Sequence, residues 1–459
     1  MKIIKTLLVM LLALSVAACS NSSENGGTVA GNKEETISIP FISEEVKMFP
    51  KEASIEETTL YDQDGLVIIA KEIDYSYFSP QYVLEFQNNT DAEYQFLAGT
   101  LGHCANAING YMIQSGYINV TVAPGTAETE KVTINADMLK LLGITEIGEI
   151  IMDIEIEDTD SKSTYTGPLS VKTSEYENID MTPAFAKAIK NKTIIDKAEY
   201  KIKYMAEDVL FDECDVKMVS EVLVRNASDE DALLLEFKND LGKDCYISIE
   251  NIGINGMTVS SGRWTSDYVY DGKSVVMSIN LSYVVDTFER EAFGLDDYGV
   301  ISFDVSVYDK SFKEAAVEGK LVEVTVGKGS KLDTSGDTLY DNNGIVVISK
   351  GLYDDDSEYS NDVHWIMMVT NNTDKTIRVE DEYHSQFING NKVEYSYMSS
   401  QYVEPGKSCI LDMVLSEYDF KNLNISSKDD IKSVSTKLVI RDSHYDTIDS
   451  SEISLNFGE

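Results

Sequence analysis

The chain has few of the side chains on which metal sites and many active sites depend. Its 459 residues include only five Cys and four His, and no two Cys stand in a Cys-x-x-Cys pair. Structural zinc sites need closely spaced Cys or His ligands, so the sequence predicts no metal site, and no cofactor is expected. No sequence context marks a general base among the four histidines, which are His103, His364, His384 and His444.

The signature motifs of several enzyme classes are missing as well. There is no Gly-x-Ser-x-Gly motif, no Gly-x-Gly-x-x-Gly motif and no phosphate-binding loop. With 79 Asp and Glu residues, a catalytic pair of carboxylates cannot be distinguished from solvated surface. We therefore assign no catalytic residue and expect a protein that is not an enzyme. A carboxylate-based extracellular hydrolase stays open as an alternative.

Positive charge is scarce. Only 38 Lys and Arg oppose the 79 acidic residues, which leaves a net charge of −41. Such a charge repels phosphates, so we expect no nucleic-acid partner. Its plain interpretation is solubility, and a cationic partner is the alternative. The hydrophobic content of 43% is ordinary for folded domains and excludes a disordered acidic tail.

Proline is also rare, at seven residues, whereas tyrosine is frequent, at 26. Tyrosine favours strands and surfaces where one end of the side chain is apolar and the other is wet. The cysteines leave one disulfide open, between Cys214 and Cys245, because both fall in the same stretch of the chain. The favoured alternative is separate buried thiols at Cys104, Cys214, Cys245 and Cys409.

The first residues have the layout of a secretory signal. Lys2 and Lys5 precede an apolar run at residues 6–18 that is short for a membrane span. The sequence Leu-Ser-Val-Ala-Ala-Cys at residues 14–19 resembles a bacterial lipobox. The resemblance implies a signal peptide at residues 1–18, a lipid on Cys19, and attachment to the extracytoplasmic face of the cell membrane. The alternative is an ordinary cleaved signal with a coincidental Cys.

A polar segment follows the lipobox. Residues 20–27 read Ser-Asn-Ser-Ser-Glu-Asn-Gly-Gly, a composition too polar to bury and typical of flexible linkers. Pro40 and Pro50 interrupt any regular element in the charged sequence that continues to about Lys51. We therefore expect a flexible tether over residues 19–54.

A short motif, which we call the repeat-start motif, marks the beginning of a repeat. Leu-Tyr-Asp-Gln-Asp-Gly at residues 60–65 and Leu-Tyr-Asp-Asn-Asn-Gly at residues 339–344 each precede an apolar run, and residues 210–212 begin a degraded middle copy. The first copy has part of a calcium-binding loop, but the Glu that such a loop requires farther on is missing. We interpret the motif as a turn at the start of each repeat.

Further landmarks follow each repeat-start motif in the same order and at nearly constant spacing. An Asn-rich turn comes first in the outer copies, and Asn and Gly suit turns because they tolerate positive φ angles. The sequence Ile-Asn-Gly falls at residues 108–110, 254–256 and 388–390, a Pro-Gly or Asp-Gly pair falls at residues 124–125, 271–272 and 405–406, and the closing Asp residues are Asp158, Asp309 and Asp442.

Period-two runs such as residues 152–157 predict strands with one buried face. Short strands with regular turn signals predict antiparallel β-sandwiches. Short helical turns are expected near residues 136–143, 283–290 and 417–423. The expected organisation is sandwich repeat 1 at residues 55–175, a linker with a short helix at 176–200, repeat 2 at 201–328, and repeat 3 at 329–459.

This order of strands and turns over residues 55–459 resembles the tandem immunoglobulin-like modules of lipoproteins from Gram-positive bacteria. The resemblance implies an all-β chain of three immunoglobulin-like sandwiches behind a lipoprotein signal and a tether. It also implies a location at the cell surface. It supplies no catalytic residues.

Aromatic residues on predicted loops are the candidates for binding. Exposed rings can stack on sugars or anchor a protein partner, whereas the alternative is that they cap the ends of the sandwiches. The candidates are Tyr75, Tyr77, Phe78 and Tyr82 after the first repeat-start motif, Tyr353, Tyr359 and Trp365 in the matching stretch of repeat 3, and Tyr395, Tyr397 and Tyr402 farther on.

The sequence leaves three functions open. The favoured hypothesis is a non-enzymatic, lipid-anchored surface protein whose tandem domains bind a protein or a cell-wall polysaccharide. The alternatives are the hydrolase and a purely architectural spacer. A cleft with two close, shielded carboxylates favours the hydrolase, and matching loop surfaces without a cleft favour binding or spacing.

Overall fold

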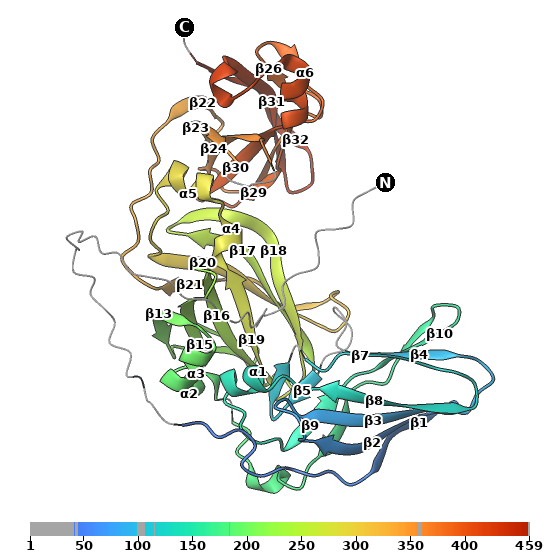
Figure 1. Cartoon of the computed structure of the whole chain (residues 1–459). Coiled ribbons are helices and arrows are strands. Elements are labelled where there is room, and N and C mark those ends of the chain that lie inside the picture. The colour runs from blue at the N-terminus through green and yellow to red at the C-terminus, as the bar shows by residue number, and fades with distance from the viewer. Residues whose placement is uncertain are drawn as a thin grey trace. The chain divides into compact units, whose positions relative to one another are not determined.

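The computed structural model describes residues 41, 45–98, 106–113, 115–182, 184–355 and 360–457. These residues form 32 strands, six α-helices and two 3-10 helices (Figure 1), so the predicted all-β class is confirmed. The lipobox, Cys19, His103, Cys104 and Tyr359 lie outside the described residues. No helix within the described ranges is long and apolar enough to span a membrane.

The chain divides into two compact units. Unit 1 consists of Met1–Lys203, Lys238–Asp240 and Val269–Val276, and unit 2 consists of Tyr204–Phe237, Leu241–Tyr268 and Met277–Glu459. The number of three sandwiches stays a prediction.

Unit 1 contains two four-stranded antiparallel sheets, in the orders β1-β2-β3-β8 and β11-β10-β4-β7, and a further run of strands, β12-β9-β5-β6. Burial alternates along β2, as the period of two predicts. The rings of Phe86 and Phe96 are 4.9 Å apart and join β3 to β4 across the core. The strands are β1 (Thr58–Gln63), β2 (Leu66–Asp74), β3 (Gln81–Asn88), β4 (Tyr94–Ala98), β5 (Asn106–Ile108), β6 (Tyr111–Ile113), β7 (Ile118–Val122), β8 (Thr126–Thr133), β9 (Glu149–Met152), β10 (Glu155–Asp158), β11 (Ser163–Tyr165) and β12 (Leu169–Lys172).

Helices cover the end of unit 1, and they correct the predicted linker. Residues 176–200 pack into the unit, because Phe185 is fully buried and the Tyr111 hydroxyl accepts hydrogen bonds from the N–H groups of Ala184 and Phe185. The segment holds two short α-helices instead of one. The helices of unit 1 are α1 (Ala136–Leu141), η1 (Tyr176–Asn178), α2 (Phe185–Ala188) and α3 (Lys192–Lys197).

The tether also ends earlier than residue 54. The Phe49 N–H donates to the Thr145 carbonyl at 2.8 Å, Ala53 is buried, and Lys51 forms an ion pair with Glu175 at 2.9 Å. In the described end of this segment, Phe49 and Ala53 therefore pack within unit 1, although the segment is polar in composition.

The middle part of the chain contributes long strands. In unit 2, a nine-stranded sheet contains the path β21-β20-β17-β18-β30-β24-β23-β22 and runs across the predicted boundary at residues 328–329. The sheet crosses this boundary where β18 and β30 pair in parallel, with Met257 opposite Ser408 and Thr258 opposite Cys409. The elements of the middle part are β13 (Lys201–Ala206), β14 (Phe211–Glu213), β15 (Val216–Arg225), β16 (Asp231–Asn239), β17 (Cys245–Ile254), β18 (Met257–Val269), β19 (Ser274–Asn280), α4 (Leu281–Val284), α5 (Thr287–Phe293), β20 (Val300–Tyr308) and β21 (Ala315–Thr325).

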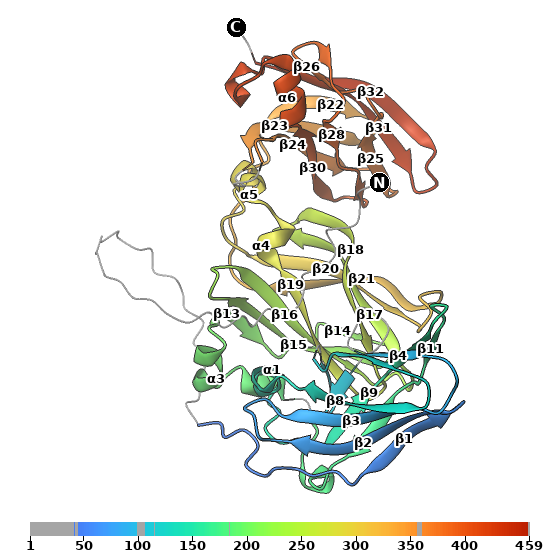
Figure 2. The same cartoon turned by 45° about the vertical axis from the view of Figure 1, so that its right-hand side comes forward.

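The last third of the chain forms a β-sandwich, which we call the C-terminal sandwich (Figure 2). Strands β22, β23, β24 and β30 face a second sheet of order β27-β26-β31-β25-β29, to which β32 adds. One hydrophobic core takes side chains from both sheets, among them Trp365 and Leu438. The elements are β22 (Asp337–Asn342), β23 (Ile345–Asp354), β24 (Val363–Asn371), β25 (Ile377–Asp381), β26 (Phe387–Ile388), β27 (Asn391–Lys392), β28 (Tyr397–Met398), β29 (Gln401–Val403), β30 (Ser408–Leu415), α6 (Glu417–Leu423), η2 (Lys428–Asp430), β31 (Ser433–Asp442) and β32 (Thr447–Asn456).

The repeat-start motif forms a β-hairpin turn. Asp64-Gly65 joins β1 to β2, Asn343-Gly344 joins β22 to β23, and Cys214-Asp215 joins β14 to β15. Both residues of each pair have positive φ angles, as the tight hairpin turn requires. The middle copy forms the same turn with Cys214 and Asp215 and without a Gly, so the turn persists although the motif is degraded.

The Ile-Asn-Gly landmark has one structural role in all three copies. Asn109, Asn255 and Asn389 have φ angles of 45°, 53° and 51°. Each side-chain oxygen accepts two consecutive backbone N–H groups at the start of a later strand, and each side-chain amide donates to a carbonyl just before that strand. The landmark therefore fastens a hairpin to the strand that closes the repeat.

Replacing Asn109 by alanine is expected to lower the free energy of unfolding of unit 1 by about 2 to 4 kcal/mol. The side chain is 6% exposed, so its loss leaves two buried N–H groups without an acceptor, and alanine is strained at this φ angle. Urea denaturation measures the loss. The matched control is Asn389→Ala, whose equivalent contacts are more exposed. An equal loss in both variants contradicts the role of burial.

The closing aspartates are also turn residues. The Oδ1 atoms of Asp158, Asp309 and Asp442 each accept hydrogen bonds from the N–H groups two and four residues farther along, at 2.8 to 3.2 Å. The Asn-rich turns are also held by side chains that bond the backbone. The side chains of Asn88 and Asn371 are fully buried, and each side-chain amide donates to two backbone carbonyls, one within the turn and one on a later strand. These landmarks build the fold, so function must be sought elsewhere.

The helical segments and the cysteines can also be compared with their predictions. The predicted short helices are confirmed as α1, as α4 with α5, and as α6. No disulfide joins Cys214 to Cys245. Cys214 is exposed at the β14–β15 turn, so its prediction as a buried thiol is wrong, whereas Cys245 and Cys409 are buried.

Candidate binding surface

Two of the predicted binding residues belong to the core. Tyr82 on β3 is 1% exposed, and Trp365 on β24 is fully buried with its Nε1 donating to the Ser349 hydroxyl at 2.8 Å. Their prediction as binding residues is wrong, because both lie within strands on the face that packs inward. A ring in this position cannot contact a ligand.

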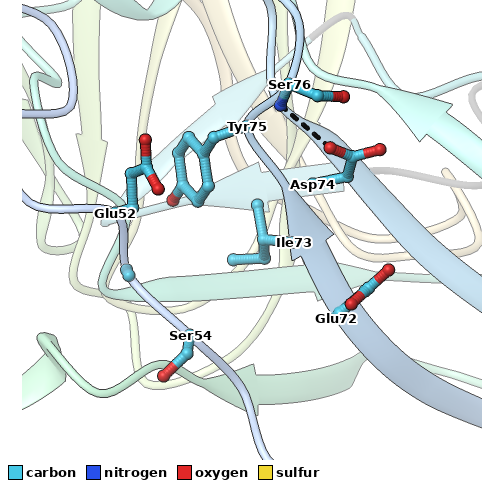
Figure 3. A pocket seen from close by; sticks show the side chains of 8 residues that line it. Glu52, Ser54, Glu72, Ile73, Asp74, Tyr75 and Ser76 are labelled. Atoms are coloured by element: carbon cyan, nitrogen blue, oxygen red, sulfur yellow. Dashed lines mark hydrogen bonds between the residues drawn. The ribbon is translucent and has the colours of Figure 1, made fainter.

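The other aromatics after the first repeat-start motif lie at the edge of unit 1. Tyr77 and Phe78 are 63% and 61% exposed. Tyr75 is half-buried, packs edge-on against Phe49 at 5.3 Å, and lines a surface hollow of about 430 Å³ (Figure 3). The hollow is acidic, since its lining includes Glu52, Glu72 and Asp74.

The charge of Asp74 in this hollow is already compensated. Its carboxylate accepts a hydrogen bond from the Ser76 N–H and pairs with Lys131, each at 2.9 Å. These hydrogen bonds hold the pKa of Asp74 well below its usual range. Because Asp74 is paired in this way, its carboxylate is not available in the hollow as an unpaired charge for a ligand.

Tyr353 is half-buried on β23, and its hydroxyl donates to the Lys350 carbonyl at 3.2 Å. Its hydroxyl group is therefore already engaged within the strand. Tyr359, its predicted companion, lies outside the described residues.

The predicted tyrosines of the C-terminal sandwich are exposed. Tyr395, Tyr397 and Tyr402 are 54%, 57% and 38% exposed. The structure brings to them two tyrosines that the sequence analysis missed. The ring of Tyr418 lies 5.8 Å from that of Tyr395, and the hydroxyl of Tyr445 lies 3.0 Å from that of Tyr402.

The register of three strands builds a cluster around Tyr402. Arg378 on β25 is directly opposite Tyr402 on β29 and Arg441 on β31. Burial alternates along β25, so Arg378 and Glu380 share the outer face while Ile377 and Val379 enter the core. We call Arg378, Glu380, Tyr402, Arg441 and Tyr445 the tyrosine–arginine cluster.

The cluster is held by ion pairs and ring contacts. The Glu380 carboxylate pairs with Arg378 Nη2 at 2.8 Å and with Arg441 Nε at 2.6 Å. The Arg378 guanidinium lies over both phenol rings, 5.6 Å from the centroid of Tyr402 and 5.1 Å from that of Tyr445. Within the cluster, the guanidinium groups of Arg378 and Arg441 share the single carboxylate of Glu380.

The two hydroxyl groups are also electronically distinct. The hydroxyl groups of Tyr402 and Tyr445 share a hydrogen bond in which either can be the donor, and this bond raises the pKa of Tyr402. The same bond, with the nearby charge of Arg378, lowers the pKa of Tyr445. The surface therefore combines a cation, two hydrogen-bonded hydroxyl groups and two exposed aromatic rings.

Two buried carboxyl groups bear on the hydrolase alternative. Burial raises the pKa of Glu221 to about 7 and that of Asp304 to about 6. Perturbed carboxyl groups are typical of catalytic sites when they line a cleft. These two side chains are 0% and 4% exposed, so a substrate cannot reach them in this structure.

Comparison with known proteins identifies no family for this chain. No family model matches it, and no curated protein matches it. Among solved structures, a protein of unknown function from Porphyromonas gingivalis W83 aligns with 50% of this chain and 92% of its own, at 11% identity and a TM-score of 0.15. A biofilm-associated protein, BSP domain, aligns with 91% of this chain and 68% of its own, at 9% identity and a TM-score of 0.14.

The transglutaminase of red sea bream is a third similar structure. It aligns with 59% of this chain at 11% identity and a TM-score of 0.13, and the match spans about a third of the enzyme, 31%. TM-scores this low carry no argument about fold or function. The function must therefore be argued from the residues of this chain.

Proposed function

We propose that this protein is a non-enzymatic, lipid-anchored protein of the extracytoplasmic cell surface that binds a cell-wall polysaccharide through the tyrosine–arginine cluster. The lipobox supports the location. The single observation that supports the binding role is the pairing of two exposed phenol rings with Arg378 on the outer face of one sheet.

The surroundings of the cluster favour a saccharide over a protein. Arg378 Nη2 also donates to the Ser400 hydroxyl at 3.1 Å, and Arg441 Nη1 donates to the Thr447 hydroxyl at 2.8 Å. Protein hot spots place their aromatics in well-packed, water-excluding pockets, whereas this cluster is ringed by hydroxyl and charged groups. Such groups can bond sugar hydroxyls while the rings contact the C–H faces of the sugar.

Replacing Tyr402 or Tyr445 by alanine is expected to weaken binding to purified cell-wall polysaccharide by about tenfold, equivalent to about 1.4 kcal/mol. Each substitution removes one ring of the pair and leaves the sandwich core intact, because both side chains lie on the outer face. Co-sedimentation of the full chain with insoluble polysaccharide measures the affinity. Arg378→Gln is expected to have a similar effect.

The matched control is Tyr383→Ala, because Tyr383 is the most exposed aromatic of the C-terminal sandwich among the described residues, at 84%, and lies outside the cluster. Its affinity should equal that of the unsubstituted chain. Failure of the unsubstituted chain to bind the polysaccharide overturns the proposal. A protein recovered from intact envelope through Tyr402 would then assign the cluster to protein binding, and no ligand at all would favour a spacer.

A further inference from the structure

A buried histidine connects the two parts of unit 2. His364 on β24 is 8% exposed, and its ring stacks on Phe288 of helix α5 with centroids 4.1 Å apart and an interplanar angle of 22°. Helix α5 belongs to the middle part of the chain, whereas β24 belongs to the C-terminal sandwich. The stack is therefore a contact between them, in addition to the parallel pairing of β18 with β30.

The hydrogen bonds of His364 determine how protonation of its ring changes its contacts. Nδ1 lies 2.9 Å from Oδ2 of Asp412 on β30, so Nδ1 carries a proton and donates it to this carboxylate. Nε2 is buried, has no hydrogen-bond partner among the described residues, and lies 3.9 Å from Oδ2 of Asp355. In the neutral ring Nε2 presents a lone pair to a carboxylate, so two acceptors face each other. A second proton turns this repulsion into an ion pair.

Acidic groups surround the ring on every packed element. Asp412 comes from β30, Asp355 follows β23, and Asp286 and Glu289 come from the start of α5, where the Asp286 N–H donates to Glu289 Oε2 at 2.9 Å. Further titratable or charged groups lie nearby. Arg290 of α5 acts on Asp286, and Asp412 and Asp362 act on Tyr397 of β28. Tyr353 is the strand partner of His364. The carboxylates outnumber the cations, so a positive imidazolium is favoured.

We propose that this junction is a proton-operated latch, in which the doubly protonated ring of His364 holds helix α5 against the C-terminal sandwich and loss of the proton loosens the helix. The latch is independent of the polysaccharide site, since no residue of the tyrosine–arginine cluster takes part. It would make the connection between the two parts respond to the acidity outside the membrane.

The electrostatics agree with this geometry. Burial lowers the pKa of His364, but the hydrogen bond and charge of Asp412, with the charges of Asp355 and Asp286, outweigh burial and raise the pKa above 6.5. A histidine with a raised pKa contributes its full stabilisation below the unfolded pKa and loses it as the pH rises through the folded pKa. Burial also raises the pKa of Glu289 to about 8, and its ionisation destabilises the junction in the same direction.

The test is hydrogen exchange of the α5 amides in the full chain at pH near 6 and near 8.5, corrected for intrinsic exchange. We expect exchange at Thr287–Phe293 to be about tenfold faster at the higher pH, equivalent to about 1.4 kcal/mol in the free energy of opening. His364→Phe keeps a ring on Phe288 and removes the histidine titration, so the pH dependence should fall to the smaller part that Glu289 contributes. Equal protection at both pH values in the unsubstituted chain overturns the proposal.

Two further variants keep the test decisive if His364→Phe does not fold. Asp355→Asn retains His364 and its bond to Asp412, removes the ion pair at Nε2, and should reduce the pH dependence. His444→Gln is the matched control, because His444 is exposed in the turn between β31 and β32, and it should behave as the unsubstituted chain. A pH dependence that survives unchanged in Asp355→Asn, or is lost in His444→Gln, contradicts the latch.

Discussion

Replacing Trp365 by alanine is expected to lower the free energy of unfolding of the C-terminal sandwich by about 3 to 5 kcal/mol. The indole is fully buried among side chains from both sheets, and neighbouring strands hold its backbone on each side. Its removal leaves a cavity that close-packed strands cannot fill, and it leaves the Ser349 hydroxyl without its donor. Urea denaturation followed by circular dichroism measures the loss.

Two variants separate the causes of this loss. Trp365→Phe keeps one ring but removes the indole N–H and part of the volume, so its smaller loss combines the hydrogen bond, about 1 kcal/mol, with a smaller cavity. Trp264→Ala is the matched control, because the other tryptophan is only partly buried on β18. If Trp365→Ala costs no more than Trp264→Ala, the position of Trp365 at the centre of this core is wrong.

Replacing Cys19 by alanine is expected to transfer nearly all of the protein from the membrane fraction to the soluble fraction. The lipobox resemblance implies that the thiol of Cys19 receives the lipid, and stable anchoring of a polar chain requires more than one acyl chain. Without the thiol no lipid can be attached. Fractionation of cells, with incorporation of labelled fatty acid, measures both consequences.

The control for Cys19→Ala is Ser20→Ala, which changes the neighbouring residue and keeps the thiol. This variant should remain in the membrane fraction and take up the label. If Cys19→Ala stays bound to membranes after a high-salt wash, the proposed anchor is wrong, and residues 6–18 must attach the chain in another way.

The turns and the strand periodicity of the fold could be predicted from sequence. Asn109, Asn255 and Asn389 are followed by Gly at a repeated place, and this pattern predicts a turn with positive φ because only local sterics decide it. Strand periodicity likewise predicted the all-β class. The long-range contacts of the same asparagines could not be predicted, since the strands that they fasten lie some 40 residues farther along.

The candidate site shows where prediction from sequence ends. Trp365 and Tyr402 are both aromatic, and both were placed on predicted loops, yet one is fully buried and the other is exposed. A shift of one residue in register turns a side chain to the opposite face of a sheet, and register depends on partners distant in sequence. Arg378 was missed for the same reason, because only its pairing with β29 places it beside Tyr402 and Tyr445.

The sequence by itself determined the all-β class, the order of the turns and the resemblance to a lipoprotein signal, because each follows from local composition or from periodicity. Only the tertiary structure decided that the Asn of each Ile-Asn-Gly landmark bonds a later strand, that β18 and β30 pair across a predicted boundary, and that His364 contacts Phe288. These features arise from contacts between segments far apart in the chain, where strand edges and side-chain burial are set by packing.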